Sequence, residues 1–313
     1  MSVHLESVSE FLASHLGGKV TALEMLVGGD WSQAFGFQFD GRDLVARFGA
    51  HVDDFEKDRV ATRFSCADLP IPEVLEIGAA FDGFFCISHR VFGEMLDALD
   101  TDEMKRAIPA VLRTLDALRL ADFGLWAAEL GAPTVSWAEQ LLSVDGENER
   151  VFGWHDALRE SPTGIEPFRK GLAYLEAHVA ACPEGNHLLH NDLLHRNVTV
   201  VDDKITGVFD WGCAGRGDFL YELAFFTFYT PWFPAMAAID WKGEARRHYA
   251  EIGLDVPDFD ERLRCYEVHI GLSGMAYNGF IRDWDDLKAH TVRTLERFDG
   301  VDREPSKPQR GAE

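Results

Sequence analysis

The spacing of hydrophobic and polar residues separates an N-terminal region with strand-like periodicity from a longer region with helical periodicity. Residues 4–16 carry apolar side chains at helical spacing and end at Gly17-Gly18, which predicts a helix with a glycine C-cap. Short strand-like runs follow, separated by turn signals such as Asp40-Gly41. The predicted strands are Lys19–Val27, Ala34–Phe39, Leu44–Phe48, Val74–Ile77 and Phe84–Ser88. We therefore expect a five-stranded antiparallel sheet in the first part of the chain.

A helix is also predicted inside the strand region, at residues 53–66, and helical spacing dominates the chain after Gly93. The helix expected at residues 101–120 is long and amphipathic, with Thr101 as its N-cap. Another helix starts at Ser136-Trp137, and the remaining ones are predicted at residues 149–160, 166–181, 219–229, 242–252, 260–276 and 283–298. The polar end of the chain, residues 301–313, contains two prolines and predicts a disordered tail. The fold class is α+β.

Composition and charge exclude some classes of partner. The chain has 313 residues, of which 46% are hydrophobic and 27% charged, as in ordinary globular proteins. Its 53 acidic and 30 basic residues give a net charge of −23, which argues against nucleic acid or an anionic membrane as a partner. An acidic cleft would concentrate a cationic small-molecule substrate, although an evenly solvated acidic surface explains the charge equally well.

Cysteine usage and hydrophobicity predict a cytoplasmic protein, expected to be a monomer. Five scattered cysteines without C-x-x-C spacing suggest neither a disulfide framework nor a zinc site. The N-terminal residues lack the pattern of a signal peptide. The longest apolar run, residues 220–239, contains Glu222 and two prolines, so it is expected to be buried instead of crossing a membrane.

The strongest chemical signal lies at residues 187–212. His190, Asp192 and Asn197 form the pattern H-x-D-x-x-x-x-N, and a predicted hairpin runs from Asn197 to Asp210-Trp211-Gly212. The two ends of a hairpin lie side by side, so the amide oxygen of Asn197 and the carboxylate of Asp210 are expected to converge. Such oxygen ligands suit Mg²⁺. Asp192 precedes the hairpin on a loop, where it is expected to orient a substrate hydroxyl for phosphoryl transfer.

This spacing matches the kinase pattern H-R-D-L-x-x-x-N followed by D-F-G, with Asn191 in place of Arg and Trp211 in place of Phe. The Arg reads activation-loop phosphorylation, so its absence predicts a kinase without that switch. The segments HNDLLHRNV, ITGVFDWG and GDFLYELA resemble the aminoglycoside phosphotransferase family, and the likeness extends over nearly the whole chain. Within that family, the chain is most similar to the 4-O-kinase subgroup, whose acceptor is hygromycin B.

The resemblance implies a protein-kinase-like two-lobe fold, with an N-lobe at residues 1–88, a hinge at 89–92 and a helical C-lobe at 93–300. It implies Mg²⁺ and ATP as cofactors, with GTP as the alternative phosphate donor. The loop at residues 28–33 is expected over the phosphates, and Arg47 takes the strand position at which most members have Lys. The residues expected to contact the nucleotide, or to support that contact, are Ser32, Arg47, Glu56 as the partner of Arg47, and Ser88 and Arg90 at the hinge.

A kinase-like C-lobe would place the acceptor between the catalytic loop and the last helices. Acidic side chains there would bind a cationic acceptor, and aromatic and amide side chains would stack on and hydrogen-bond to a sugar. The candidates are Glu222, Trp232, Tyr277, Asn278 and Asp283.

Three other hypotheses remain open at this stage. His190, Asp192, His195 and Asp210 could form the metal site of a metal-dependent hydrolase, although this leaves Asn197 and the strand region unexplained. A non-catalytic nucleotide-binding protein is also conceivable, but all three catalytic positions are intact. The third hypothesis keeps the kinase chemistry and changes the acceptor to another aminoglycoside, an aminocyclitol, a macrolide or a metabolite alcohol.

Overall fold

The computed structural model describes residues 3–26, 31–131 and 134–298. Contacts within the chain group it into two compact units. The first contains residues 1–132 and 190–215, and the second contains residues 133–189 and 216–313. The chain therefore leaves the first unit and returns to it with the segment that carries the motif.

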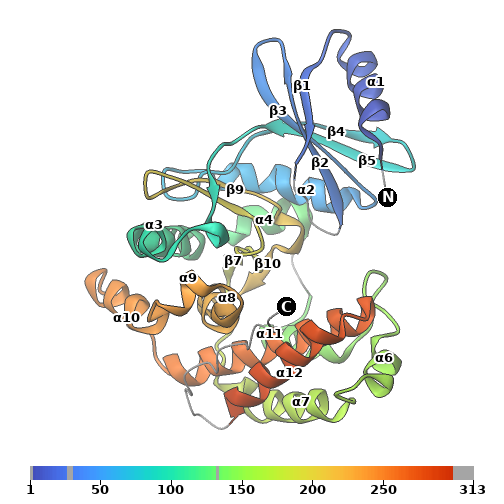
Figure 1. Cartoon of the computed structure of the whole chain (residues 1–313). Helices are drawn as coiled ribbons and strands as arrows, with labels where there is room; N and C mark the ends of the chain where they lie inside the picture. Colours follow the sequence, from blue (N-terminus) through green and yellow to red (C-terminus); the bar gives the residue numbers. More distant parts are fainter. Residues whose placement is uncertain (1–2, 27–30, 132–133, 299–313) are drawn as a thin grey trace, which may run out of the picture. The chain divides into compact units, whose positions relative to one another are not determined.

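The first unit is built on the predicted five-stranded antiparallel sheet, whose strand order is β1-β2-β3-β5-β4 (Figure 1). Its strands are β1 (Thr21–Met25), β2 (Ser32–Phe39), β3 (Arg42–Gly49), β4 (Val74–Ala80) and β5 (Gly83–His89). Phe39 pairs with Arg42 across the predicted Asp40-Gly41 turn, and both turn residues have positive φ, as a tight two-residue hairpin requires.

Alternation along β3 gives the sheet two chemically different faces. Leu44, Ala46 and Phe48 are buried in a core that also contains Val8 and Leu12 of α1 (Leu5–Leu16). Arg47 alternates with these residues and points to the other face of the sheet. Helix α1 ends at Gly17 in the left-handed conformation, as predicted.

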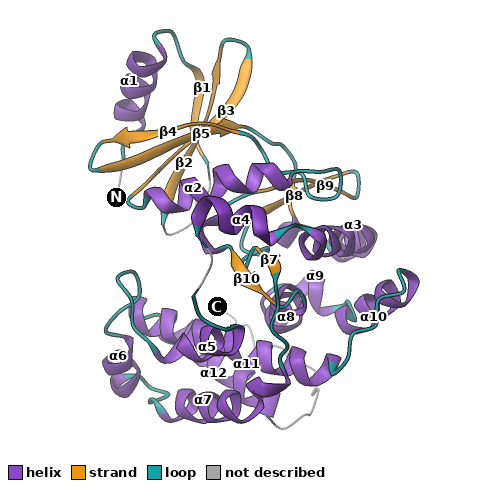
Figure 2. Ribbon diagram, turned by 180° about the vertical axis from the view of Figure 1, so that it is seen from behind, coloured by secondary structure: helices purple, strands orange, loops and turns teal. Residues whose placement is uncertain are grey.

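The rest of the first unit is mainly helical, with one small sheet, and it carries the motif. The helices are α2 (Val52–Ala61), α3 (Thr101–Leu120) and α4 (Phe123–Leu130), with short 3₁₀ turns at Thr62–Phe64, Leu96–Ala98 and Trp211–Cys213 (Figure 2). A three-stranded sheet has the order β6-β8-β9, with β6 (Glu94–Met95), β8 (Val198–Val201) and β9 (Lys204–Val208). β8 and β9 form the predicted hairpin.

The second unit is mainly helical, as expected. Its helices are α5 (Trp137–Leu142), α6 (Trp154–Glu160), α7 (Glu166–His178), α8 (Leu220–Tyr229), α9 (Pro234–Ala237), α10 (Trp241–Glu251), α11 (Phe259–Ile281) and α12 (Trp284–Phe298), with 3₁₀ turns at Ser143–Asp145, Val179–Ala181 and Thr230–Trp232. β7 (His187–Leu189) pairs with β10 (Gly215–Gly217), whose last two residues belong to this unit.

A buried ion pair links the start of α8 to α11. The Asp218 carboxylate accepts hydrogen bonds from Arg262 at 2.6–3.0 Å and from the Tyr266 hydroxyl at 2.6 Å. Both charged side chains are at most 5% exposed. Burial would lower the pKa of Arg262, but Asp218 outweighs that effect and raises it.

Several predicted element ends differ from the structure for local reasons. The helix predicted at 149–160 begins only at Trp154, because the Asn148 side chain accepts the N–H groups of Arg150 and Val151 and holds a turn. The N-cap of α3 is Asp100 instead of Thr101, and it forms a capping box with Glu103. The predicted tail at 301–313 lies outside the described residues.

Two other expectations can be compared with the structure. All five cysteines are free in the structure. In the part of the chain that the structure describes, no helix is both long enough and apolar enough to cross a bilayer.

Candidate active site

The β8–β9 hairpin brings Asn197 and Asp210 together as predicted. Val198 pairs with Val208 at the open end of the hairpin, and the Phe209 N–H donates to the Asn197 carbonyl at 3.1 Å. Asn197 therefore lies just before one strand, and Asp210 follows closely after the other. Asp210 has a φ of 66°, a left-handed conformation that is uncommon for a residue other than glycine.

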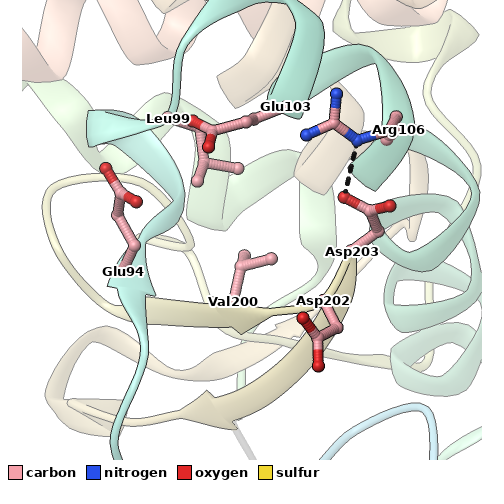
Figure 3. Close-up of a pocket in the computed structure, with 7 residues that line it drawn as sticks. All are labelled: Glu94, Leu99, Glu103, Arg106, Val200, Asp202 and Asp203. Carbon is pink, nitrogen blue, oxygen red and sulfur yellow. Dashed lines mark hydrogen bonds and ion pairs between the residues drawn. The ribbon is translucent and has the colours of Figure 1, made fainter.

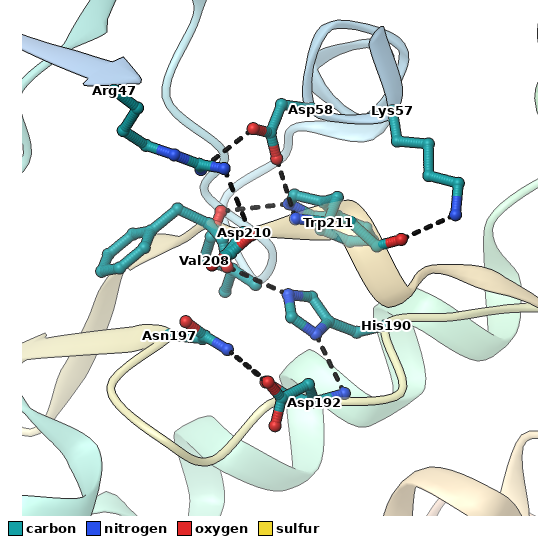
Figure 4. A network of polar contacts seen from close by, with 11 residues as sticks. Arg47, Lys57, Asp58, His190, Asp192, Asn197, Val208, Asp210 and Trp211 are labelled. Carbon is teal, nitrogen blue, oxygen red and sulfur yellow. Dashed lines mark hydrogen bonds and ion pairs between the residues drawn. The ribbon is translucent and has the colours of Figure 1, made fainter. Parts of the chain in front are cut away.

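The loop that carries Asp192 is held by a buried histidine. The His190 side chain is fully buried, and burial lowers its pKa, so the imidazole is neutral. Its Nδ1 accepts the Asp192 N–H at 3.2 Å, which leaves the ring proton on Nε2, donated to the Phe209 carbonyl at 3.1 Å. His190 thus joins the start of the loop to the end of the hairpin (Figure 4).

Asp192 lies beside Asn197 within the same loop. The Asn197 amide Nδ2 donates to the Asp192 carbonyl at 2.7 Å and to its carboxylate Oδ2 at 3.1 Å. Since Asn197 Nδ2 donates to Asp192, Oδ1 is the amide atom that remains to bind a cation. Figure 4 shows this oxygen on the side of the amide away from Asp192.

Arg47 reaches the site from the sheet and contacts two carboxylates. Its guanidinium lies 2.9 Å from Asp58 and 3.2 Å from Asp210. Burial on its own would lower the pKa of Arg47, but these two carboxylates raise it. Burial raises the pKa of Asp58 to about 6, against the opposing effect of Arg47.

Helix α2 holds the D-W-G segment through one face. Asp58 Oδ1 accepts the Trp211 N–H at 2.8 Å, and Lys57 Nζ donates to the Gly212 carbonyl at 2.6 Å (Figure 4). A Cβ added to Gly212 would lie 3.1 Å from the Asp54 carboxylate, so glycine permits the close approach of the two segments.

The prediction that Glu56 is the partner of Arg47 is wrong. Asp58 takes that place, and Glu56 forms an ion pair with Arg59 on the same helix. Side chains two positions apart on an α-helix point in directions that differ by about 200°. Glu56 therefore points away from Arg47 when Asp58 points towards it.

The donor set fits a hard divalent cation. The Asn197 amide oxygen and the Asp210 carboxylate lie at the same end of the hairpin, and Asp210 is 39% exposed. Asp58, Asp192 and Asp210 together outnumber the two cations Arg47 and Lys57. An oxygen-rich site with excess negative charge is suited to Mg²⁺, which would be held by Asn197 and Asp210.

The metal site expected for a metal-dependent hydrolase loses one of its predicted ligands, His190. Both ring nitrogens of His190 are engaged with the backbone, and Nδ1 of His195 contacts Asp192 Oδ1 at 2.5 Å. Within residues 3–26, 31–131 and 134–298, no cluster of three or more His, Cys, Asp or Glu side chains is arranged to hold a metal.

Comparison with known proteins decides the family. Residues 26–254 match the family model described as the phosphotransferase enzyme family, APH. The chain belongs to this family. The phosphotransferase is also 32% identical, over 288 residues, to hygromycin-B 4-O-kinase of Escherichia coli, covering 90% of this chain and 81% of that protein.

Solved structures of the same kind match this phosphotransferase closely. A thermostable mutant of aminoglycoside phosphotransferase APH(4)-Ia, in a ternary complex with ADP and hygromycin B, has a TM-score of 0.80 at 29% identity, covering 95% of this chain and 99% of that one. A second mutant, bound to AMP-PNP and hygromycin B, has a TM-score of 0.80 at 30% identity, covering 95% and 100%. The predicted protein-kinase-like fold is confirmed.

The other residues predicted to contact nucleotide lie on the sheet. Ser32 is the first residue of β2 and pairs with Gly49, whereas residues 27–30 of the expected phosphate loop lie outside the described residues. Ser88 lies in β5, paired with Val45. The Arg90 N–H donates to the Asp43 carbonyl at 3.0 Å, and its guanidinium donates to Glu24 at 2.8 Å.

The candidate acceptor residues all lie in the second unit. Asn278 is buried and donates to the Gly274 carbonyl, and Asp283 caps α12 by accepting the N–H groups of Asp285 and Asp286. Glu222 is also buried, at 1% exposed. Trp232 and Tyr277 are only partly buried, and Trp232 donates to Asp286 at 3.3 Å. These two rings retain surface that a ligand can contact.

A separate pocket of about 330 Å³ lies in the first unit between α3 and the hairpin. Figure 3 shows four carboxylates on it, from Glu94, Glu103, Asp202 and Asp203. Arg106 binds Asp203 at 3.1 Å, and Glu103 is the capping-box partner of Asp100 at the start of α3. None of the residues predicted for catalysis or nucleotide binding lines this pocket.

Proposed function

We propose that this phosphotransferase is a Mg²⁺-dependent kinase that transfers the γ-phosphate of ATP to a hydroxyl of an aminoglycoside, with hygromycin B as the acceptor. The observation that carries the proposal is the convergence of Asp192, Asn197, Asp210 and Arg47 around one end of the β8–β9 hairpin. The similarity to hygromycin-B 4-O-kinase and to structures bound to ADP and hygromycin B supports both the donor and the acceptor.

Each residue has a role that follows from its chemistry. Asp192 accepts a hydrogen bond from the acceptor hydroxyl and aims its oxygen at the γ-phosphate. Arg47, fixed by Asp58, is the cation that offsets phosphate charge. Asn197 and Asp210 would hold Mg²⁺, which neutralises charge on the phosphates when bound. Little covalent chemistry is required of the protein, because positioning and fixed charges supply most of the catalysis.

The acceptor is a polar cation, and the net charge of −23 favours its attraction. Trp232 and Tyr277 are the candidates of the second unit that can stack on a sugar ring. Glu222 and Asn278 would support this surface from within the fold, and Asp283 would contribute from the exposed start of α12. We also propose that the protein is a cytoplasmic monomer that binds neither nucleic acid nor membranes.

The test is an ADP-release assay with Mg²⁺, ATP and a panel of aminoglycosides that includes hygromycin B. We expect release that depends on hygromycin B, and a product heavier by one phosphate in mass spectrometry. GTP in place of ATP reports the choice of donor. Asp192→Ala should fold and lose nearly all transfer. ADP release only with another aminoglycoside of the panel would identify that compound as the acceptor in place of hygromycin B. No transfer to any member of the panel would overturn the proposal.

A further inference from the structure

The carboxylate of Asp192 is held by two side chains of its own loop, one on each oxygen. His195 Nδ1 lies 2.5 Å from Oδ1, and Asn197 Nδ2 lies 3.1 Å from Oδ2. An ionised carboxylate only accepts hydrogen bonds, so Nδ1 of His195 carries the proton in this contact. Both oxygens of the group that faces the acceptor hydroxyl therefore have a fixed donor.

The local backbone explains how a residue three positions later reaches back to Asp192. Leu193 and Leu194 are buried, at 2% and 1% exposed, and anchor the middle of the loop. The chain then turns through the left-handed region at His195, with φ 58°, and at Arg196, with φ 69°. Two consecutive residues other than glycine in this region are unusual and indicate a constrained loop.

We propose that His195 is a positioning residue for phosphoryl transfer, acting through the Asp192 carboxylate. This proposal rests on the function proposed above. The terminal torsion of an Asp side chain has a broad, roughly two-fold preference, so one donor alone leaves the carboxylate plane loosely defined. Donors on both oxygens fix that plane and leave the remaining lone pairs directed at the acceptor hydroxyl.

The contact between His195 and Asp192 should affect turnover without affecting folding stability, so the two roles can be distinguished by experiment. The side chains are 42% and 29% exposed, and such exposed pairs contribute little to folding. Loss of His195 should therefore change turnover and leave the melting temperature unchanged. Because Arg47, Asp58 and Asp210 do not depend on His195, nucleotide binding should also be unaffected.

The first measurement compares His195→Ala with His195→Asn in the ADP-release assay, with hygromycin B as the acceptor. We expect kcat to fall by about 10- to 100-fold in the alanine variant, as for a misplaced catalytic group, with an unchanged KM for ATP. The asparagine amide can replace the Nδ1 donor and should restore most of kcat. His4→Ala is the control, because His4 is exposed and its side chain makes no capping hydrogen bond to α1.

The second measurement repeats His195→Ala in an Asp192→Ala background, at high enzyme concentration. A residue that acts only through Asp192 causes no further loss there. The role of His195 would be refuted by an equal decrease of kcat in both backgrounds, or by an unchanged kcat for His195→Ala in the wild-type background. Either result would leave the proposed function standing. Absence of transfer by the wild-type enzyme would overturn the proposed function, and the inference with it.

Discussion

The contact between Asp58 and Arg47 joins the sheet to the D-W-G segment, and removing it gives a prediction whose size can be worked from the structure. In Asp58→Ala, Arg47 loses a partner at 2.9 Å, and the Trp211 N–H loses its acceptor. The two charged side chains are only 13% and 8% exposed. Breaking a buried pair by removing one partner costs about 3–5 kcal/mol.

We expect a value near the lower end, about 3 kcal/mol, because Asp210 still lies 3.2 Å from Arg47. That loss corresponds to a decrease in melting temperature on the order of 10 °C for a domain of this size. Arg47 would then bind Asp210 more closely and compete with the cation there, so kcat/KM for ATP should fall by about 100-fold.

Glu56→Ala provides a matched control on the same helix. Glu56 pairs with Arg59, which is 59% exposed, and an exposed pair at this spacing contributes only about 0.3–0.5 kcal/mol. Urea unfolding and ADP-release kinetics of both variants test the assignment. If Asp58→Ala costs less than about 1 kcal/mol, or Glu56→Ala impairs kinetics equally, Asp58 is not the residue that fixes Arg47.

Three further predictions concern the second unit. Arg262→Met should destabilise the protein by about 3–5 kcal/mol in urea unfolding, because Asp218 is left buried without its ion-pair partner; a cost below about 1 kcal/mol would contradict this. Burial lowers the pKa of His269 to about 4, so the unfolded chain binds more protons between about pH 4 and 6.5. The stability that neutral His269 contributes is complete above about pH 6.5 and decreases by at most about 3 kcal/mol as the pH falls towards 4. His269→Gln should therefore flatten this part of the curve of unfolding free energy against pH. An unchanged slope would show that His269 is not responsible. Gly185→Ala should cost about 3 kcal/mol or more by thermal melting, since its Cβ would lie 2.1 Å from the Asp218 nitrogen; a wild-type melting temperature would show that the backbone adjusts freely.

The sequence predicted the centre of the site because hairpin geometry is local. Once Asn197 and Asp210 bracket two strands joined by a tight turn, pairing places them together without any knowledge of the remaining fold. The five-stranded sheet was predictable for the same reason, since alternation and turn residues mark each strand. Arg47 was implied by the family resemblance, and the alternation of β3 places it on the face opposite Leu44, Ala46 and Phe48.

The contacts made by helices were not predictable from the sequence. Choosing between Glu56 and Asp58 requires the rotation of α2 about its axis, and that is set by packing of Phe55 and Val60 in the folded unit. Asn278 and Asp283 have the composition of ligands, yet one is a core residue and the other a helix cap. The contact of His195 with Asp192 was not predictable either, because nothing in the sequence reveals two successive left-handed residues.

A crystal structure of the phosphotransferase with Mg²⁺, AMP-PNP and hygromycin B would test the proposed catalytic arrangement most directly. We expect Mg²⁺ at about 2.0–2.1 Å from oxygens of Asn197 and Asp210, as is usual for this ion. An acceptor hydroxyl should lie within hydrogen-bonding distance of Asp192 and in line with the γ-phosphate. A γ-phosphate bound far from these three side chains, with the hydroxyl facing another residue, would contradict the assignment.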